Sequence, residues 1–431
     1  MVTNTIQPPT ALPLLPKDIV YNIADNLSNR DLYHLAVTCK DLNSDVAHTL
    51  ELRELRSTVS TLVKLGKTPR ALTKLPQWKE AINPPRNAEN RPLFDAISSQ
   101  KQEAALWLLD NGCHSLEKSD ADRFSALTEA VMSYADGPKE LEAKHRLIQR
   151  LIDGGADINV RSPGGQTPMF HAAFREDEGT LAMLLDHGAD PRCQADSGDT
   201  VLHQQAKAPT RNPQSFERLV RMVPSILDLP NNRGELPIHS ACAFHRPDNV
   251  AILSAYQIGI EARDNLDQTP LHLAITSGFR PQICEDLMTP NTLNAKDINQ
   301  CTPLHLASQR LDPTQVMELL DQGSFVMEQD NDGNTPAHAY VQKMASHPDS
   351  ELLMEPLQRF LEHPEFDVNS QNYDGKTILH LAGEGNHKQA FQMILATGGN
   401  LNIRDGQGRI PKVPNPRLRE VQNLNNLTWI P

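Results

Sequence analysis

The sequence predicts an all-α solenoid, built from helix pairs that are joined by short β-hairpin loops. The first observation is a recurring tetrapeptide whose first residue is usually Thr and whose fourth is usually His. Its seven copies are Thr167-Pro168-Met169-Phe170, Thr200-Val201-Leu202-His203, Leu236-Pro237-Ile238-His239, Thr269-Pro270-Leu271-His272, Thr302-Pro303-Leu304-His305, Thr335-Pro336-Ala337-His338 and Thr377-Ile378-Leu379-His380. Successive copies start 33, 36, 33, 33, 33 and 42 residues apart, a period typical of a repeat protein rather than of a compact enzyme core.

The second observation is an aliphatic residue nine positions before most motif starts, which we expect to close the outer helix of the preceding repeat. The series reads Leu116, Ile158, Leu227, Ile260, Leu293, Val326, Val368 and Leu401. The same spacing locates degenerate motif starts at Arg91, Ser125 and Ile410. The two observations together predict nine repeats over residues 91–409, starting at 91, 125, 167, 200, 236, 269, 302, 335 and 377. Residues 68–90 are then an N-terminal capping half-repeat, and residues 410–431 a C-terminal cap and tail.

Local chemistry explains why a helix begins at each motif. Thr269 is placed to cap the first helix of its repeat with its hydroxyl. Pro270 follows at the first helical position, where a missing N–H costs nothing. Leu271 and Ala274 lie three residues apart on one face, and the small Ala lets the next helix approach closely.

The tetrapeptide and its period resemble the ankyrin repeat. The resemblance extends over residues 68–431 and is strongest between 236 and 340. In that family the His of the motif ties neighbouring hairpin loops together by hydrogen bonds. The resemblance therefore implies a structural role for these histidines, rather than metal binding or catalysis.

Two repeats are longer than the others, because the motif starts at Ser125 and Thr335 are each followed by a spacing of 42 residues. The extra residues fall in two polar segments, 133–145 and 342–355. We expect both inserts in the turn between the two helices of a repeat, where additional loop length costs little entropy.

A different pattern precedes the repeats. Residues 1–11 are expected to be disordered, and apolar residues at helical spacing then predict two short helices and a third, longer one. The three apolar stripes are Ile19, Ile23 and Leu27; Leu32, Leu35, Ala36 and Cys39; and Leu42, Val46, Leu50, Leu55, Val59 and Leu62. The module covers residues 12–50, and a connecting helix continues over 51–67. A unit of roughly forty residues buries too little apolar surface to be stable alone, so a partner or fused domain is expected to cover part of it.

The order of residues in this module resembles the F-box. The matching positions are Leu15, Pro16, Asp18, Ile19, Ile23, Leu27, Asp31, Leu32, Leu35, Ala36, Cys39, Lys40 and Leu42. The resemblance implies docking onto the Skp-type adaptor of a cullin ubiquitin ligase, while the rest of the chain selects the substrate. The residues expected to contact the adaptor are Leu15, Pro16, Ile19, Ile23, Leu35, Cys39 and Lys40. An F-box ahead of ankyrin repeats is similar to an arrangement found in fungal proteins. The alternative is that these helices only cap the solenoid.

Composition excludes several classes of function. Residues 1–90 carry 11 Lys and Arg against 9 Asp and Glu, whereas the remainder carries 30 against 45. Because affinity for phosphates needs clustered Lys and Arg, an acidic array argues against nucleic acid as a partner. No apolar run is long enough to span a membrane, no secretory segment is apparent, and the six cysteines form no Cys-x-x-Cys pair. We therefore expect a cytoplasmic or nuclear protein with reduced thiols.

Motifs for catalysis or cofactor binding are missing from the sequence. It contains no phosphate-binding Gly-rich loop, no nucleophile elbow and no His-Glu-x-x-His. The run Asp330-Asn331-Asp332-Gly333 starts like a calcium loop but fits a hairpin tip better, because its Gly stands two residues before Thr335. We expect no enzymatic activity, no cofactor and no metal site.

Binding of an unknown substrate protein is assigned to the hairpin tips, three and four residues before each motif start. The candidate residues are Asn232, Arg233, Leu266, Ile298, Asn299, Asp332 and Tyr373. Most are turn residues, for which turn formation is a sufficient account. Turn formation does not require large apolar side chains at Leu266, Ile298 and Tyr373. The sequence thus predicts a substrate-recognition adaptor of a ubiquitin ligase, with a non-ligase interaction scaffold as the alternative.

Overall fold

A computed structural model describes residues 43–68, 70, 73, 77–84, 91–114, 116, 124–135, 137–209, 213–279, 285–344 and 351–414. The chain divides into two compact units, unit 1 (residues 1–193) and unit 2 (residues 194–431). The described residues of both units form helices, turns and loops, and no strand is present among them. The all-α class predicted from the sequence is thus confirmed for this part of the chain. The adaptor-contact candidates Leu15, Pro16, Ile19, Ile23, Leu35, Cys39 and Lys40 lie outside the described residues.

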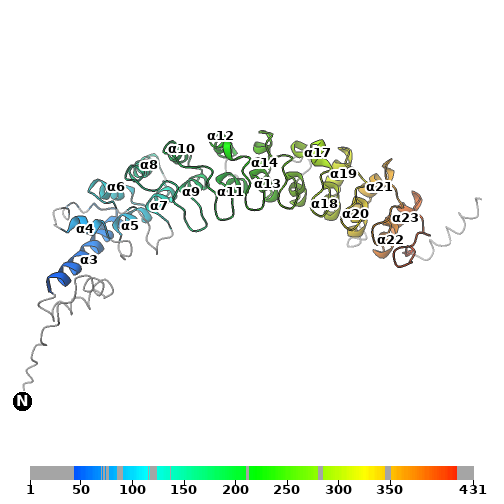
Figure 1. Cartoon of the computed structure of the whole chain (residues 1–431), viewed down its shortest axis with the longest axis horizontal. Helices are drawn as coiled ribbons and strands as arrows, with labels where there is room; N and C mark the ends of the chain where they lie inside the picture. The colour runs from blue at the N-terminus through cyan, green and yellow to red at the C-terminus, as the bar shows by residue number, and fades with distance from the viewer. Residues whose placement is uncertain are drawn as a thin grey trace, which may run out of the picture. The chain divides into compact units, whose positions relative to one another are not determined.

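The described residues of unit 1 form three helix pairs after two leading helices (Figure 1). The leading helices are α3 (Asn43–Lys64) and α4 (Trp78–Ile82). The inner helices are α5 (Pro92–Ser98), α7 (Ala126–Met132) and α9 (Pro168–Phe174), and the outer helices are α6 (Gln102–Asp110), α8 (Pro138–Asp153) and α10 (Glu178–Asp186). Helix α3 packs on α4 and α5, after which each inner helix contacts the next. Among the residues of α3 whose burial is described, Leu52, Val59, Ser60 and Val63 are buried, whereas Leu55 and Leu62 of the predicted stripe are only half-buried.

Unit 2 repeats the same arrangement in two rows of helices (Figure 1). The inner row is α11 (Val201–Lys207), α13 (Pro237–Ala243), α15 (Pro270–Thr276), α18 (Pro303–Arg310), α20 (Pro336–Met344) and α22 (Ile378–Glu384). The outer row is α12 (Pro213–Met222), α14 (Pro247–Ser254), α17 (Pro290–Leu293), α19 (Pro313–Asp321), α21 (Met354–Glu362) and α23 (Lys388–Ala396). Short 3₁₀ turns η2 (Pro224–Ile226), η3 (Glu285–Leu287) and η4 (Glu351–Leu353) accompany the outer row.

Small residues allow the inner helices to pack closely. Ala241, Ala274 and Ala307 stand at the same position of three successive repeats, and all are fully buried. Tyr340 takes this position in the next repeat and is also fully buried, with its hydroxyl donating to the Leu353 carbonyl at 3.1 Å. Because Leu353 belongs to the longer connection of that repeat, the added residues provide the partner that a buried phenol requires.

Two expectations about the repeat boundaries are wrong. The aliphatic residues nine positions before the motifs do not generally close the outer helix, because α8 ends at Asp153 and α14 at Ser254, several residues before Ile158 and Ile260. Leu227, Ile260 and Val326 are nevertheless buried, so in these repeats the aliphatic residue attaches the following loop to the core. The insert at 133–145 is not confined to a turn either, since it supplies the first two turns of α8, which has 16 residues where α10 has nine.

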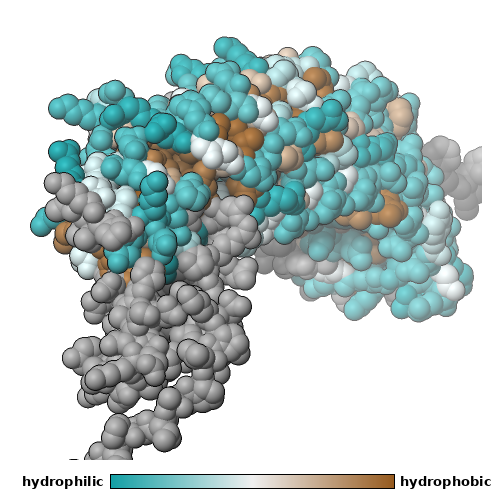
Figure 2. Space-filling model, turned by 60° about the vertical axis from the view of Figure 1, so that its left-hand side comes forward, coloured by the Kyte–Doolittle hydropathy of each residue, from teal (hydrophilic) through white to brown (hydrophobic). Residues whose placement is uncertain are grey.

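The second insert, 342–355, partly lengthens α20, which continues to Met344, and residues 345–350 of it lie outside the described residues. The visible face in Figure 2 is mainly hydrophilic, and hydrophobic atoms appear on it as separate areas. This agrees with a thin core that runs along the repeats, since each repeat buries its apolar face on its neighbours.

Candidate functional site

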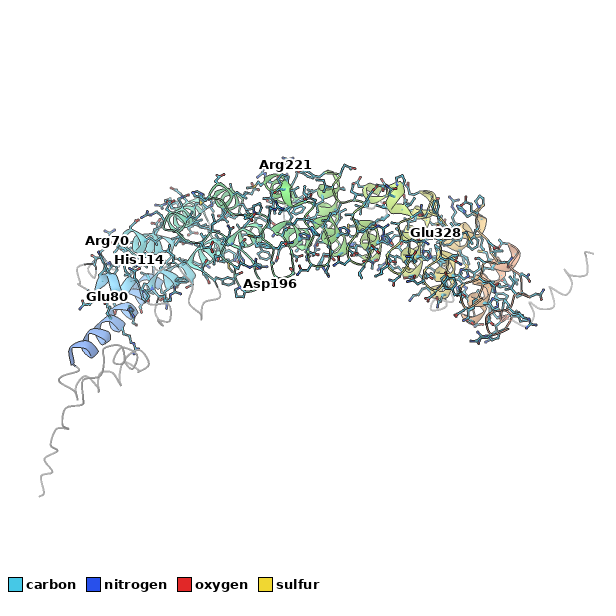
Figure 3. All side chains as sticks on the ribbon, in the orientation of Figure 1. Arg70, Glu80, His114, Asp196, Arg221 and Glu328 are labelled. Carbon is cyan, nitrogen blue, oxygen red and sulfur yellow. The ribbon has the colours of Figure 1, made fainter. Side chains whose placement is uncertain are left out.

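The candidate site is a row of turns in unit 2, which we call the tip row. It consists of the residues two to four positions before each motif start, namely 196–198, 232–234, 265–267, 298–300, 331–333, 373–375 and 406–408. The labelled residues in Figure 3 show that Asp196 of the tip row and Arg221 of outer helix α12 lie on opposite sides of unit 2. The tip row is therefore the edge of unit 2 farthest from its outer helices.

A side chain with an Asx oxygen shapes most of these turns. The series is Asn231, Asp264, Asp297, Asp330, Asn372 and Asp405, each five positions before its motif start. At Asp264, for example, Oδ1 accepts from the backbone N–H groups of Leu266 at 2.8 Å and Gln268 at 2.9 Å. Asp297 and Asp330 accept from the equivalent pairs of backbone N–H groups at 2.8–2.9 Å. These carboxylates are thus engaged in turn formation, which is the usual role of Asx side chains in loops.

Backbone hydrogen bonds connect each turn of the row to the next. Ile298 donates its N–H to the Leu266 carbonyl at 3.0 Å, and Tyr373 donates to the Asp332 carbonyl at 3.0 Å. The Asn331 N–H donates to the Asn299 carbonyl at 3.0 Å, so the ladder continues between these two pairs. Residues from separate repeats are therefore held side by side in one continuous surface.

The motif histidines connect each repeat to the loop of the next repeat by hydrogen bonds, as the resemblance implied. His305 accepts the Thr302 backbone N–H on Nδ1 at 3.1 Å, and its Nε2 lies 3.0 Å from the Asn334 carbonyl of the next loop. A carbonyl can only accept, so Nε2 carries the proton and the ring is the neutral Nε2–H tautomer. The same pair of contacts recurs at His203, His239, His272, His338 and His380. Their predicted structural role is confirmed.

Burial keeps five of these rings neutral. Removal from water disfavours the imidazolium and lowers the pKa of His203, His239, His272 and His305, and it lowers the pKa of His338 to about 4. The Thr hydroxyls also bind Nδ1, at 2.8 Å for both Thr269 and Thr302. For Thr302 the hydroxyl also accepts the His305 backbone N–H at 3.4 Å, whereas the hydroxyl of Thr269 bonds the His272 ring in place of the predicted helix cap.

The three large apolar residues predicted at the tips all lie on the surface. Leu266 and Ile298 are each 52% exposed, and Tyr373 is 73% exposed. Leu266 and Ile298 are neighbours through their backbone hydrogen bond, whereas Tyr373 lies further along the row beside Asp332. Their side chains thus add apolar area to an otherwise polar edge.

The remaining predicted residues serve the turns as well as the surface. Asn232 donates its side-chain amide to the Asp196 carbonyl at 3.0 Å. Arg233 is turned toward the Glu235 carboxylate, with Nη2 to Oε2 at 2.9 Å. The backbone groups of Asn299 and Asp332 take part in the ladder and the Asx bonds, and both side chains are exposed.

Sequence reasoning missed three residues of the row. Asp267 and Asp374 are exposed acids directly beside Leu266 and Tyr373. Gly333 matters because the Tyr373 ring lies against it: a Cβ on Gly333 would be 2.5 Å from Tyr373 Cδ1. The two acids follow from their adjacency in the sequence, but the contact between Gly333 and Tyr373 joins different repeats and carries no local signal.

Cys301 has the most strongly shifted thiol among the described cysteines. Burial raises the pKa of the Cys301 thiol to about 12, so this cysteine is protonated at neutral pH and a poor nucleophile. No group of three or more His, Cys, Asp or Glu among the described residues is arranged to hold a metal ion. Within the same residues, no helix is both long and apolar enough to cross a membrane. The absence of enzymatic activity, cofactor and metal stays a prediction.

Comparison with known families agrees with the period and the histidine network. Residues 304–405 match the family described as Ankyrin repeats (3 copies). The chain contains ankyrin repeats. The ankyrin fold is a module for protein–protein interaction, and the tip row is an exposed edge of that module. The prediction of ankyrin repeats that mediate protein–protein interaction is confirmed.

Several ankyrin proteins are similar to parts of the chain. The human transient receptor potential cation channel subfamily A member 1 is 26% identical over 161 residues, covering 36% of this chain and 14% of the channel. A putative ankyrin repeat-containing protein of Treponema pallidum is 32% identical over 108 residues, covering 25% of this chain and 33% of that protein. Human Rabankyrin-5 is 24% identical over 193 residues, covering 43% of this chain and 16% of that protein. The chain spans a third or less of the length of each of these relatives.

One solved structure is similar to about half of the chain. The ankyrin repeat domain of Bcl-3, a member of the IkappaB protein family, aligns with 53% of this chain and 100% of its own at 24% identity and a TM-score of 0.44. The assignment of ankyrin repeats rests on the family match and on the His305-type contacts described above.

Proposed function

We propose that the chain is a substrate-recognition adaptor of a Skp/cullin/F-box ubiquitin ligase, in which residues 12–50 dock onto the ligase and the ankyrin array holds the substrate protein. The observation that supports substrate binding is the tip row, where Leu266, Ile298 and Tyr373 are exposed on turns that successive backbone hydrogen bonds hold in place. Apolar and aromatic residues on a rigid exposed edge favour protein contact, because little entropy is lost when a partner binds.

The ligase half of the proposal is supported by the sequence alone. The Leu15-Pro16 pair, the helical apolar stripes and the Cys39-Lys40 pair follow the order of an F-box. In this proposal the chain makes and breaks no bonds itself and works in the cytoplasm or the nucleus. Ubiquitin transfer to the substrate is left to the recruited ligase.

The alternative is an ankyrin scaffold that does not recruit a ligase. It is supported by α3, a single helix that begins in the F-box-like segment, continues beyond residue 50 and packs on α4 and α5. A helix that packs on the array in this way is also what a simple N-terminal cap requires.

Affinity capture from cell extract separates the two functions. The full chain is expected to copurify with a Skp-type adaptor and a cullin, and both are expected to disappear when Ile23 is replaced by Asp. An unpaired carboxylate in an apolar contact costs several kcal/mol, which is enough to abolish a docking contact of this size. If the Ile23→Asp variant retains its helical spectrum and still captures adaptor and cullin, the docking assignment is wrong and the scaffold function is favoured.

A second experiment tests the tip row. Replacing Leu266, Ile298 and Tyr373 together with Ser should remove substrate proteins from the proximity-labelled set, while adaptor capture and the helical spectrum remain unchanged. The matched control replaces Ile258 and Phe325 with Ser, since these side chains are 39% and 53% exposed in unit 2 but lie outside the tip row. An identical labelled set for the triple variant and the original chain would exclude the tip row as the substrate-binding surface.

A further inference from the structure

The strongest local feature of the tip row is the position of the Tyr373 ring. A Cβ on Gly333 would lie 2.5–2.8 Å from three ring atoms, Cδ1, Cε1 and Cγ, which places the ring against the Gly333 backbone. Gly333 also has φ +74°, a backbone conformation that favours glycine. The ring is 73% exposed even though it rests on this glycine. Tyr373 is thus a fixed aromatic surface, and a ligand that stacks on it need not first order it.

Two acidic residues adjoin Tyr373, one on the neighbouring turn and one in the chain. Asp332 is adjacent because its carbonyl accepts the Tyr373 N–H at 3.0 Å, and Asp374 follows in the chain. Both side chains are exposed, and neither forms an ion pair with any other residue that the structure describes. An exposed aromatic face beside uncompensated negative charge is the combination that attracts a cation.

Cations on the Tyr373 turn and on the following turn have partners of their own. Lys376 Nζ lies 2.9 Å from Glu384 Oε2. The Arg409 guanidinium pairs with Asp405 at 2.8 Å, and Arg404 donates to the Gly408 carbonyl at 2.7 Å. The negative charge around Tyr373 is therefore left for an external partner to neutralise.

The rest of the tip row adds apolar contacts and no cation that could neutralise the acidic residues beside Tyr373. Leu266 and Ile298 are bonded neighbours, and the Asn331 side-chain amide donates to the Ile298 carbonyl at 3.3 Å, which continues the surface toward Asp332. Arg233 is the one cation among the tip-row residues, and its guanidinium is turned to Glu235 at the far end. Toward Tyr373 the surface is acidic and apolar.

We infer that this part of the tip row binds a polypeptide segment that combines basic and apolar side chains. A Lys or Arg of the partner lies on the exposed face of Tyr373 between Asp332 and Asp374, and neighbouring apolar side chains contact Ile298 and Leu266. The inference rests on the proposed function of the tip row as the substrate-binding surface. It specifies the chemistry of the substrate segment that is recognised.

Fluorescence anisotropy with three labelled peptides of equal length tests the inference on the full chain. The probes alternate Arg with Leu, Glu with Leu, or Arg with Ser. We expect the Arg–Leu peptide to bind at least tenfold more tightly than either of the others. Its affinity should fall as salt is raised, because charge pairs at an exposed surface are screened. Equal or tighter binding of the Glu–Leu peptide would overturn the inference.

Variants separate the Tyr373 site from general attraction to an acidic protein. Tyr373→Leu keeps the apolar bulk and removes the aromatic face, so it should weaken Arg–Leu binding about tenfold, whereas Tyr373→Phe should bind like the original. Asp332→Asn with Asp374→Asn should weaken binding by a similar factor. The matched control, Glu355→Gln with Glu365→Gln, removes the same charge from exposed positions outside the tip row and should change little. If the control weakens binding as much as the Asp332/Asp374 double variant, or if Tyr373→Leu binds normally, the inference is wrong.

Failure of this inference and failure of the proposed function give different results. If the triple Ser variant loses its substrate proteins in cells but the Arg–Leu peptide shows no dependence on Tyr373, the tip row binds substrates of another chemistry and only the inference fails. If the triple variant keeps all its substrate proteins, the proposed function of the tip row fails as well.

Discussion

Units 1 and 2 are built from the same helix pair, but they join neighbouring repeats in different ways. In unit 2 the buried motif histidines bond to the first residue of their own motif and to the next loop, as His305 does. In unit 1 the motif that starts at Thr167 has Phe170 at the usual His position, and His171 follows it. The buried Nε2 of His171 has no hydrogen-bond partner. Its ring instead packs edge-on against Phe124, with 5.5 Å between ring centroids.

Charged pairs between outer helices take the place of the histidine network in unit 1. Lys144 of α8, which is only 4% exposed, lies 2.9 Å from the Asp177 carboxylate that caps α10. Burial alone would raise the pKa of Asp177, but hydrogen bonds from Thr180 and Lys144 outweigh it and lower this pKa to about 2. The comparison shows that one repeat geometry accommodates two kinds of polar link between neighbouring repeats.

Acid should distinguish the two units most strongly. The unfolded chain protonates its histidines below about pH 6.5, whereas burial keeps folded His338 neutral down to its pKa of about 4. Stability that is present above pH 6.5 is therefore lost as the pH falls toward 4, by about 3 kcal/mol for His338 alone. His203, His239, His272 and His305 shift in the same direction.

Unit 1 should resist this acid range better. The Asp177 pKa lies at about 2, below the usual value of 3.8, so the contribution of its charge is lost only below about pH 4. Hydrogen exchange read by mass spectrometry between pH 7.5 and 4.5, corrected for intrinsic rates, should show faster opening of α13–α20 before α6–α10. Equal loss of protection in both units would mean that the histidines do not control acid stability.

Removing one histidine should affect unit 2 more than unit 1. His305→Ala deletes a fully buried ring and leaves the Thr302 N–H and the Asn334 carbonyl without their partner, which we expect to cost about 3 kcal/mol. His171→Ala deletes a half-buried ring whose Nε2 has no hydrogen-bond partner, and we expect it to lower the free energy of unfolding by about 1 kcal/mol. Urea midpoints from helix circular dichroism compare the two, and a larger loss for His171→Ala would contradict the comparison.

Breaking the buried ion pair between Lys144 and Asp177 should destabilise unit 1 rather than unit 2. Lys144→Met removes the cation from Asp177 but leaves the Thr180 N–H on that carboxylate at 3.0 Å, so we expect a loss of about 2 kcal/mol rather than the full value of a broken buried pair. Arg146→Met is the control, because its pair with Glu103 is exposed and should contribute less than about 1 kcal/mol. Equal urea midpoints for both variants would show that the Lys144 pair adds no stability.

The smallest expected effect is that of the threonine caps. Thr302→Ala removes the bonds from the hydroxyl to His305 Nδ1 and from the His305 N–H, and should cost about 1 kcal/mol. Thr167 occupies the same position in unit 1 but makes no side-chain cap bond, so Thr167→Ala should cost only a few tenths of a kcal/mol. If thermal unfolding shows the same loss of stability for Thr302→Ala and Thr167→Ala, the threonine cap and its histidine are not energetically linked.

The sequence by itself determined the repeat architecture. Pro303 one residue after Thr302 marks the helix start that is observed in α18, and His305 could be assigned a structural role from its place in the motif. The helix start was predictable because it depends on residues a few positions apart, whereas the role of His305 followed from the resemblance of its motif to the ankyrin repeat. The exposure of Leu266, Ile298 and Tyr373 was predictable for a related reason, since turn tips of a stacked array face solvent.

Tertiary structure alone decided how repeats meet. The insert at 133–145 extends helix α8 because Lys144 finds Asp177 of the following repeat, a contact that no local pattern encodes. Tyr340 stands where other repeats have Ala because the Leu353 carbonyl accepts its hydroxyl. The Tyr373 ring rests on Gly333 because a backbone hydrogen bond aligns two turns from different repeats. Such contacts depend on the register between repeats, which is set by packing along the whole stack and not by the residues beside them in sequence.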